Sequence, residues 1–489
     1  SFPTRRSSDP MDLIVTAVAA AMTAWRGDDT YTLSVESHGR GDDGRFADTV
    51  GWFTRTLVID AAGLDDSAAR APELWVASAA MVKERRRDAD ARPSDRARAA
   101  VQVNYHGHVD DAFPAPWRLL PDSIGHDRSL RQPRLHPFDV TALVTAAGFE
   151  LRLQYDGASH AAAAMQSLVG SIGEALTSLA ESLVTAHPRF TVSDVPAARL
   201  SSDDLIVLHE VGLHPGVADD AFTLSPTQQG MLFHAVDEPD SEMYVNQLTC
   251  IIDAPLDVTA FVQAWQRVTA RHAALRTSFH WERLPHPVQI VHADFSVPYE
   301  SRDWRARSSD EQDVAWQQLC DADRARGFDL TRPPLQRLLL ARTGDTRYRF
   351  CWTQHHLLLD GWSAAIVLDE VLGAYLGRAV DDRCPRRYRD AVVWIEQQER
   401  EQLAVFWRDR LADRPAVTPL PAGRQLFDGA TTPFACREVE RVLSASGSAA
   451  VRELAEREHL TLSSIMQGAW ALALARQSGE RDVIFGAVV

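Results

Sequence analysis

The sequence predicts a mixed α/β protein built from two related units. The chain has 489 residues, which is too long for one hydrophobic core, so we expect about two or three domains. Residues 11–35 read as a helix, a Gly-Asp-Asp turn and a strand, and residues 461–489 repeat that order around a Ser-Gly-Glu turn. The simplest explanation is two copies of one domain type, the first without its front and the second without its back. We therefore expect a fragment of a longer protein.

Composition and charge narrow the class of protein. Hydrophobic residues make up 45% of the chain and charged residues 24%, as in soluble globular proteins. The net charge of −16 argues against nucleic-acid binding, which needs a clustered basic surface. The basic run KERRR at 83–87 is followed closely by Asp88 and Asp90, as expected for a solvated helix face or loop.

Cysteine usage and targeting signals indicate a cytoplasmic protein. Five cysteines, at 250, 320, 351, 384 and 436, form no CxxC pair, which favours a reducing compartment over a disulfide framework or a zinc site. The apolar stretch Leu13–Trp25 is too short to span a bilayer, and no signal peptide precedes it. We expect no membrane contact. Residues 1–10 are polar and aperiodic, and we interpret them as a foreign scar.

The first unit ends in a long helix and a connecting segment. Residues 161–186 carry apolar side chains at spacings of three and four, which predicts a helix. The following segment is rich in Pro, Ser and Asp, so we place a linker at 188–220.

The second unit opens with helices that carry clear start signals. In LSPTQQGMLFH, at 224–234, Ser225 suits an N-cap, Pro226 the first helical position, and Gln228 completes a capping box. A second helix is expected at about 258–273, capped by Asp257. Its apolar positions, such as Phe261 and Trp265, define one face.

Two adjacent histidines follow a predicted strand. Residues 346–354 (TRYRFCWTQ) alternate between apolar and polar, which predicts a strand. His355 and His356 come next, then three leucines, Asp360 and Gly361. We expect Ser363 to cap the next helix. The pair therefore lies at a strand end before a helix, where α/β proteins often place functional groups.

The histidine pair allows three interpretations. One imidazole can act as a general base or stabilise charge in a transition state, while its neighbour points to the other face and serves structure. In that case we expect Asp360 to be buried and paired with an arginine, Arg271 or Arg276, and Gly361 to let substrate approach the backbone. Alternatively, both histidines are structural. A metal site lacks support, because no further ligand lies at suitable spacing.

The stretch HHLLLDG at 355–361 resembles the HHxxxDG motif of condensation domains from nonribosomal peptide synthetases. Segments similar to the other motifs of that family occur in order around it. They are SPTQQGMLFH (225–234), RHAALRTSF (271–279), GFDLTRPPLQRLLL (327–340), YRDAVVW (388–394) and DVIFGAVV (482–489).

The front of the chain resembles the C-terminal half of an epimerization domain, a relative with the same fold. The similar segments are ESHGR (36–40), VGWFT (50–54), VNYHGH (103–108) and SDVPAARLSSDDL (193–205). This part departs from the pattern at Ser37, where the motif has glycine, and at 91–100, where ARPSDRARAA replaces a glycine-rich stretch. The HHxxxDG motif of such a domain would lie before residue 1.

The resemblance implies a fold and a domain order. Condensation domains consist of two chloramphenicol-acetyltransferase-like subdomains in a V-shaped pseudodimer, here truncated at both ends. Residues 11–187 would form the C-terminal subdomain of an epimerization-type domain. Residues 221–394 would form the N-terminal subdomain of a condensation domain with its HHxxxDG motif, and residues 395–489 the start of the C-terminal subdomain.

The resemblance also implies the chemistry and its residues. Two carrier-protein domains would deliver thioesters on phosphopantetheine arms, and the acceptor amine would attack the donor thioester. His356 would be catalytic, supported by His355, Asp360 and Gly361. Glu36 would move the α-proton in the epimerization half, with Asn104 and Tyr105 close by. The condensation domain would take a D-configured donor, since an epimerization domain precedes it.

The same resemblance sets the cofactors, partners and alternatives. The chain itself would bind no cofactor and no metal, and adjacent adenylation domains of the same synthetase would be further partners. The residues agree with aminolysis, because a histidine titrates near neutral pH and no GxSxG elbow or paired Cys–His is visible. One alternative is a freestanding acyltransferase that uses coenzyme A or a carrier, and another is a non-catalytic carrier-docking module. We expect the fragment alone to be inactive.

Overall fold

The computed structural model divides the chain into two compact units, Ser1–Glu396 and Gln397–Val489, which are described separately. The described residues are 9–37, 39, 49–64, 72–91, 99–108, 134–145, 148–185, 189–238, 242–294, 296–378, 386–412, 418 and 439–487. Most of the expected foreign scar and residues 92–98 therefore lie outside them. So do His38, Cys384 and Cys436.

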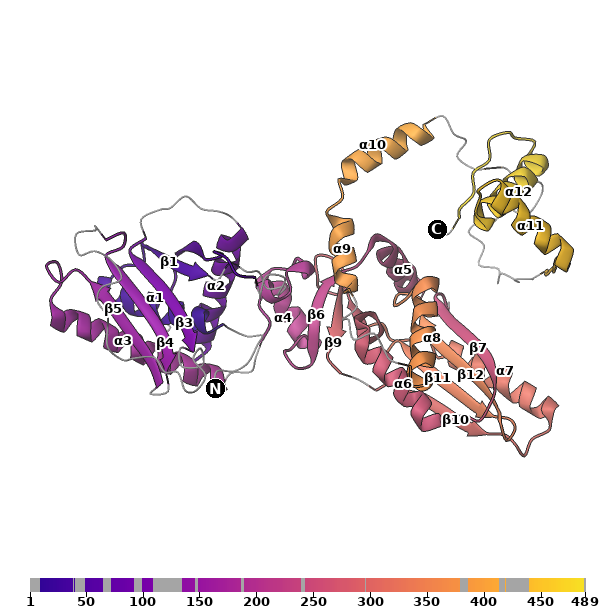
Figure 1. The fold of residues 1–489 in the computed structure, drawn as a ribbon, viewed down its shortest axis with the longest axis horizontal. Helices are drawn as coiled ribbons and strands as arrows, with labels where there is room; N and C mark the ends of the chain where they lie inside the picture. The colour runs from indigo at the N-terminus through magenta and orange to yellow at the C-terminus, as the bar shows by residue number, and fades with distance from the viewer. Residues whose placement is uncertain are drawn as a thin grey trace. The chain divides into compact units, whose positions relative to one another are not determined.

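The first sheet has five strands in the order β2-β1-β3-β4-β5 (Figure 1). β1, β3 and β4 run parallel, and the outer strands β2 and β5 run antiparallel to their neighbours. The elements are α1 (Pro10–Arg26), β1 (Thr32–Ser37), β2 (Arg55–Asp60), α2 (Pro72–Ala91), β3 (Val101–His108), β4 (Phe138–Thr145), β5 (Gly148–Tyr155) and α3 (Ala162–Thr185).

The helix–turn–strand expected at the front is confirmed. α1 begins at an Asp9–Asp12 capping box and ends at Gly27, whose φ of 81° lies in the left-handed region that suits glycine. The helix expected at 161–186 is confirmed as α3. Its apolar residues share one buried cluster with α1 and the sheet, so burial of an apolar face holds these elements together.

The segment expected as a linker, 188–220, is folded where the structure describes it. It contains η3 (Val192–Asp194), η4 (Pro196–Ala198), α4 (Ser202–Glu210) and the start of β6 (Ala218–Thr223). Phe190, Leu205 and Leu208 are buried against Val288 and Ile290. Pro, Ser and Asp therefore mark caps and short turns in this segment, as they also do inside domains.

A second, three-stranded sheet has the order β6-β9-β8, and a third, four-stranded sheet has the order β10-β11-β12-β7. β11, β12 and β7 are antiparallel, while β10 runs parallel to β11. The elements are α5 (Pro226–Asp237), β7 (Val245–Asp253), α6 (Val258–Arg271), η5 (Ala273–Arg276), β8 (Thr277–His280), β9 (Val288–His292), β10 (Tyr299–Asp303), α7 (Ser309–Ala325), β11 (Gln336–Arg342), β12 (Arg347–His355) and α8 (Gly361–Tyr375).

Helices cover both faces of the four-stranded sheet (Figure 1). Even-numbered residues of β12, such as Trp352, share a buried cluster with α6 and α8. Cys351 on the opposite face packs with Trp316 and Cys320 of α7. The period of two along a strand thus places successive side chains in two different layers.

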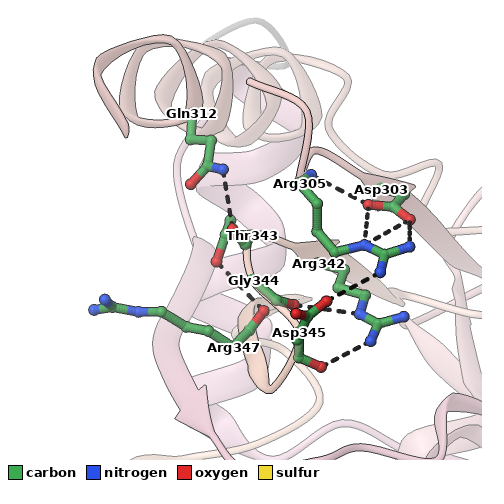
Figure 2. Close-up of polar contacts among 8 residues, drawn as sticks. All are labelled: Asp303, Arg305, Gln312, Arg342, Thr343, Gly344, Asp345 and Arg347. Atoms are coloured by element: carbon green, nitrogen blue, oxygen red, sulfur yellow. Dashed lines mark hydrogen bonds and ion pairs between the residues drawn. The ribbon is translucent and has the colours of Figure 1, made fainter. Parts of the chain in front are cut away.

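The hairpin between β11 and β12 fixes the register of β12 (Figure 2). The Thr343 amide donates to the Arg347 carbonyl at 2.9 Å. Arg342 Nη2 donates to the Asp345 carbonyl at 2.7 Å, and Gln312 Nε2 of α7 donates to the Thr343 carbonyl at 3.0 Å. A slip of one residue would move every side chain of β12 to the other face. The turn between β11 and β12 therefore helps to determine which face of the sheet each histidine side chain occupies.

Most predicted elements of the second half are confirmed. α5 has the expected Ser225–Gln228 capping box with Pro226 in its first turn, and Asp257 caps α6. The expected strand at 346–354 is β12.

The elements after α8 are α9 (Tyr388–Glu396), α10 (Arg400–Leu411), α11 (Ala445–Arg457) and α12 (Leu462–Ser478). α12 confirms the helix expected there. The strand expected at 482–489 is wrong for residues 482–487, which form no strand. An apolar run forms a strand only when it finds a partner strand. No helix in the described part of the chain combines the length and apolar composition that a bilayer crossing requires.

Candidate active site

The end of β12 and the start of α8 carry the histidine motif. His355 is the last residue of β12 and Gly361 the first of α8. Asp360 is the N-cap of α8, because its carboxylate accepts a hydrogen bond from the Ser363 amide at 2.7 Å. The bonds with Ser363 lower the pKa of Asp360. The expectation that Ser363 itself caps the helix is therefore wrong.

Asp360 does not have the environment that we expected. It is exposed rather than buried, and the two arginines considered as partners bind other acids. Arg271 Nε lies 3.4 Å from a Glu370 oxygen, and Arg276 Nη1 lies 2.9 Å from Asp219. The N-terminus of a helix stabilises a carboxylate by itself, so Asp360 needs no arginine to fix the loop.

His355 lies in an apolar environment. Only 3% of its surface is exposed, and its Nδ1 accepts a hydrogen bond from the Leu357 amide at 3.2 Å. Burial, assisted by the neighbouring His356, lowers the pKa of His355 to about 4. The ring is therefore neutral near pH 7, with its proton on Nε2.

His356 is held in one tautomer. Its amide donates to the Tyr244 carbonyl at 2.8 Å, and its ring Nδ1 lies 2.7 Å from the Leu359 carbonyl oxygen. A carbonyl oxygen can only accept, so Nδ1 carries the proton and a neutral ring keeps its lone pair on Nε2. The loop thus fixes one nitrogen and leaves the other as an acceptor, as a general base requires.

His356 lines an open pocket of about 180 Å³ on the α8 face of the third sheet. β7 and β12 form the floor of the pocket, and the first turn of α8 forms a wall. The lining residues are Asn246, Gln247, Leu248, Trp352, Gln354, His356, Asp360, Gly361 and Ala364. Adding a Cβ to Gly361 would bring no atom within 4 Å. The pocket can hold one end of an extended ligand, because sites for whole drug-sized molecules exceed roughly 300 Å³.

Gln228 of α5 supports the histidine loop. Besides its role in the capping box, its Nε2 donates to the Leu357 carbonyl at 2.9 Å, and its Oε1 accepts from Gln289 Nε2 at 3.2 Å. The sequence indicated only a helix cap here, since a cap gives a local signal and the contact with Leu357 spans 129 residues.

Arg337 of β11 supports the same region from the other face of the sheet. No local pattern in the sequence indicates this role. Its Nε donates to Asp323 at 2.8 Å, and its Nη1 donates to the Gly327 carbonyl at 2.7 Å. The guanidinium lies 4.0 Å from the centre of the Phe328 ring. That ring is perpendicular to the His355 ring, with 6.4 Å between the two centroids. The segment 327–340 thus packs behind the first histidine.

A second group of predicted site residues lies on the first sheet. Glu36 of β1 accepts hydrogen bonds from Gln102 Nε2 at 2.5 Å and from Asn104 Nδ2 at 2.7 Å, both on β3. Tyr105 points to the opposite face of the strand, packs against the buried cluster, and has its pKa raised by burial. The structure therefore brings Asn104 to Glu36 and separates Tyr105 from both. Within the described ranges, no three His, Cys, Asp or Glu side chains converge as metal ligands would.

Comparison with known proteins adds the family. The condensation domain family model matches residues 218–489. One linear gramicidin synthase polypeptide of Brevibacillus parabrevis is 32% identical over 97% of this chain and 6% of its own length. Chondramide synthase cmdD of Chondromyces crocatus is 31% identical over 98% of this chain and 14% of its own length. The chain thus spans only a small part of the curated relatives that it matches.

The solved structures to which the chain is similar include the EpoB cyclization-docking bidomain from Sorangium cellulosum. It is 18% identical, with a TM-score of 0.42 over 69% of this chain and 63% of that one. The first condensation domain of the calcium-dependent antibiotic synthetase is 20% identical, with a TM-score of 0.42 over 55% of this chain and 66% of that one. The family match covers more than half of the residues, and the chain belongs to the condensation-domain family of nonribosomal peptide synthetases.

Proposed function

We propose that this chain takes part in peptide-bond formation between two thioesters bound to carrier proteins of a nonribosomal peptide synthetase. The observation that carries the proposal is the hydrogen bond from His356 Nδ1 to the Leu359 carbonyl, which leaves Nε2 as an acceptor on a residue that lines a pocket. Family membership supports this reading of the motif.

His356 serves the reaction through its Nε2. The neutral acceptor amine attacks the donor thioester carbonyl, so a C–N bond forms and the C–S bond breaks. The amine gives up one proton, and the departing thiolate takes one up to leave as a thiol. Nε2 accepts the hydrogen bond of the attacking amine and can relay that proton. His355 and the cap at Asp360 hold the loop, and Gly361 keeps the pocket wall open.

The partners follow from the same proposal. Carrier-protein domains present both substrates on phosphopantetheine arms, and adenylation domains of the same synthetase load those carriers. The proposed setting is the cytoplasm. We place the condensation subdomains at 221–394 and 395–489, and the connecting segment before them, which is folded where it is described, at 188–220.

The test of this function is dipeptide formation between a donor and an acceptor that are both loaded on carriers. We expect His356→Ala to remove product formation by the chain in its parent synthetase. Equal product from the variant and the parent would overturn the catalytic role of His356. Transfer from coenzyme A to a free amine, without carriers, would indicate the freestanding acyltransferase instead.

We further propose that residues 11–187 derive from an epimerization domain and that the donor is D-configured. The pairing of Glu36 with Gln102 and Asn104 supports a carboxylate held in one orientation on β1. In the parent synthetase, Glu36→Gln should abolish exchange of the substrate α-proton with deuterated water. An unchanged exchange rate would remove Glu36 from the mechanism, and an equal rate with L- and D-donors would contradict the stereochemical proposal.

A further inference from the structure

Three side-chain amides occupy one row across the third sheet. Gln336 of β11 lies opposite Gln354 of β12 in the strand register, and Gln354 lies opposite Asn246 of β7. Residues that are opposite in adjacent strands project from the same face. The row therefore crosses the α8 face of the sheet from its interior to the pocket beside His356, where Gln354 and Asn246 are lining residues.

The inner member of the row is fully bonded. Gln336 is completely buried, its Nε2 donates to Thr269 Oγ1 at 3.1 Å, and its Oε1 accepts from Trp352 Nε1 at 3.1 Å. Both ends of its amide therefore have protein partners, so Gln336 has a structural role.

Gln354 differs from its neighbour. Only 6% of its surface is exposed, and its Oε1 is buried without a hydrogen-bond partner among the described residues. A buried amide oxygen without a partner costs stability, which a fold retains when another function needs the group. Rotation about the last side-chain bond exchanges the oxygen and nitrogen positions, so either end can face the pocket.

We propose that Gln354 is a positioning residue that hydrogen-bonds a secondary amide of the pantetheine-linked substrate beside His356. This inference rests on the proposed function. A glutamine amide can accept from an N–H or donate to a C=O, so the end that faces the pocket can bond one end of a secondary amide. Gln354 precedes His356 by two residues, about 7 Å along an extended chain. Both side chains line the same pocket, so a ligand bonded to Gln354 would lie beside His356.

Binding measured apart from catalysis tests this inference. The probe is an aminoacyl pantetheine in which an N–H replaces the thioester sulfur, titrated calorimetrically into the chain. Gln354→Met keeps the length of the side chain and removes the amide. We expect it to weaken binding about tenfold, as loss of one or two hydrogen bonds would, and to leave the unfolding midpoint unchanged or raised.

Two matched variants separate the possible outcomes. Gln336→Met, in the same row, should lower the unfolding midpoint and leave the affinity of the folded protein within twofold of the parent. The loss of turnover in His356→Ala, measured in the peptide-formation assay, tests the proposed function separately from this binding. An affinity of Gln354→Met within twofold of the parent would overturn the inference. It would also be overturned if the unsubstituted chain did not bind the probe, or if Gln354→Met lowered the unfolding midpoint as much as Gln336→Met does.

Discussion

His356 Nδ1 lies 2.7 Å from the carbonyl oxygen of Leu359, three residues further along the chain. This contact closes the loop between β12 and α8 and decides which ring nitrogen holds the proton. The same hydrogen bond thus sets the position of the proposed base and the tautomer of its neutral ring.

The first prediction separates these two roles. In His356→Asn the side-chain amide nitrogen can replace Nδ1 and keep the bond to Leu359, but nothing replaces Nε2. We expect the rate of peptide formation to fall by about 10² to 10⁴, the usual contribution of a general base. The unfolding midpoint should stay close to that of the parent. A variant that forms peptide at the parent rate would show that Nε2 takes no part.

The second prediction concerns pH. Burial holds the pKa of His355 at about 4, whereas an unfolded histidine titrates near about 6.5. Since the unfolded state binds the proton more readily, His355 stabilises the fold above pH 6.5, and that stability is lost as the pH falls towards 4. The loss corresponds to about 3 kcal/mol at most.

His355→Asn tests this prediction, because an asparagine oxygen can still accept from the Leu357 amide. The unfolding midpoint of the variant should depend less on pH than that of the parent between pH 6.5 and 5. Some dependence should remain, since burial also lowers the pKa of His280 to about 4. Parallel curves for variant and parent would contradict the assignment.

The third prediction compares the two partners of the α5 capping box. Ser225→Ala removes a cap and should lower the free energy of unfolding by about 1 kcal/mol. Gln228→Ala should cost more, about 2 to 3 kcal/mol, because it also leaves the buried Leu357 carbonyl without its donor. Only Gln228→Ala should reduce turnover, since Leu357 follows His356 directly. Urea denaturation and the peptide-formation assay check both effects, and equal costs for the two variants would exclude the role of Gln228 in the loop.

Sequence reasoning succeeded where the signal is local. The caps of α5 and α6, the alternation in β12 and the apolar face of α3 all follow from residues within a few positions of each other. The strand expected at 482–489 is wrong for residues 482–487, because a strand depends on pairing with a distant segment. For the same reason the sequence alone does not reveal the row Gln336, Gln354 and Asn246, which exists only in the register of three strands.

The surroundings of the histidine motif likewise depend on contacts that local sequence patterns do not predict. The motif itself could be read from the sequence, but the partner of Asp360 could not. An arginine was expected because a buried acid needs a counter-charge. An exposed acid at a helix start accepts hydrogen bonds from the backbone instead. Whether the acid is exposed depends on how the loop packs, which the local sequence does not determine.

The last prediction concerns the ion pair behind His355. Arg337 Nε lies 2.8 Å from Asp323, and the two side chains are 9% and 5% exposed. Arg337→Met leaves the buried Asp323 carboxylate with the longer contact to Arg326 Nη2, at 3.4 Å, so the variant should destabilise the fold by about 3 kcal/mol, the lower end of the range for a buried charge that loses its main partner. Arg337→Met combined with Asp323→Leu should recover much of that loss, because it removes both charges. Urea denaturation of the parent, the single variant and the double variant measures these differences.

The pair Arg305–Asp303 is the matched control. It has comparable geometry, with a shortest distance of 2.7 Å (Figure 2), but its side chains are 42% and 53% exposed. Water screens such a pair, so Arg305→Met should change stability very little. If Arg305→Met and Arg337→Met were equally destabilising, burial could not be what makes the inner pair important. If the double variant at 337 and 323 were no more stable than Arg337→Met, the charge that remains on Asp323 could not explain the loss. The cause would then be the lost packing of the guanidinium on Phe328.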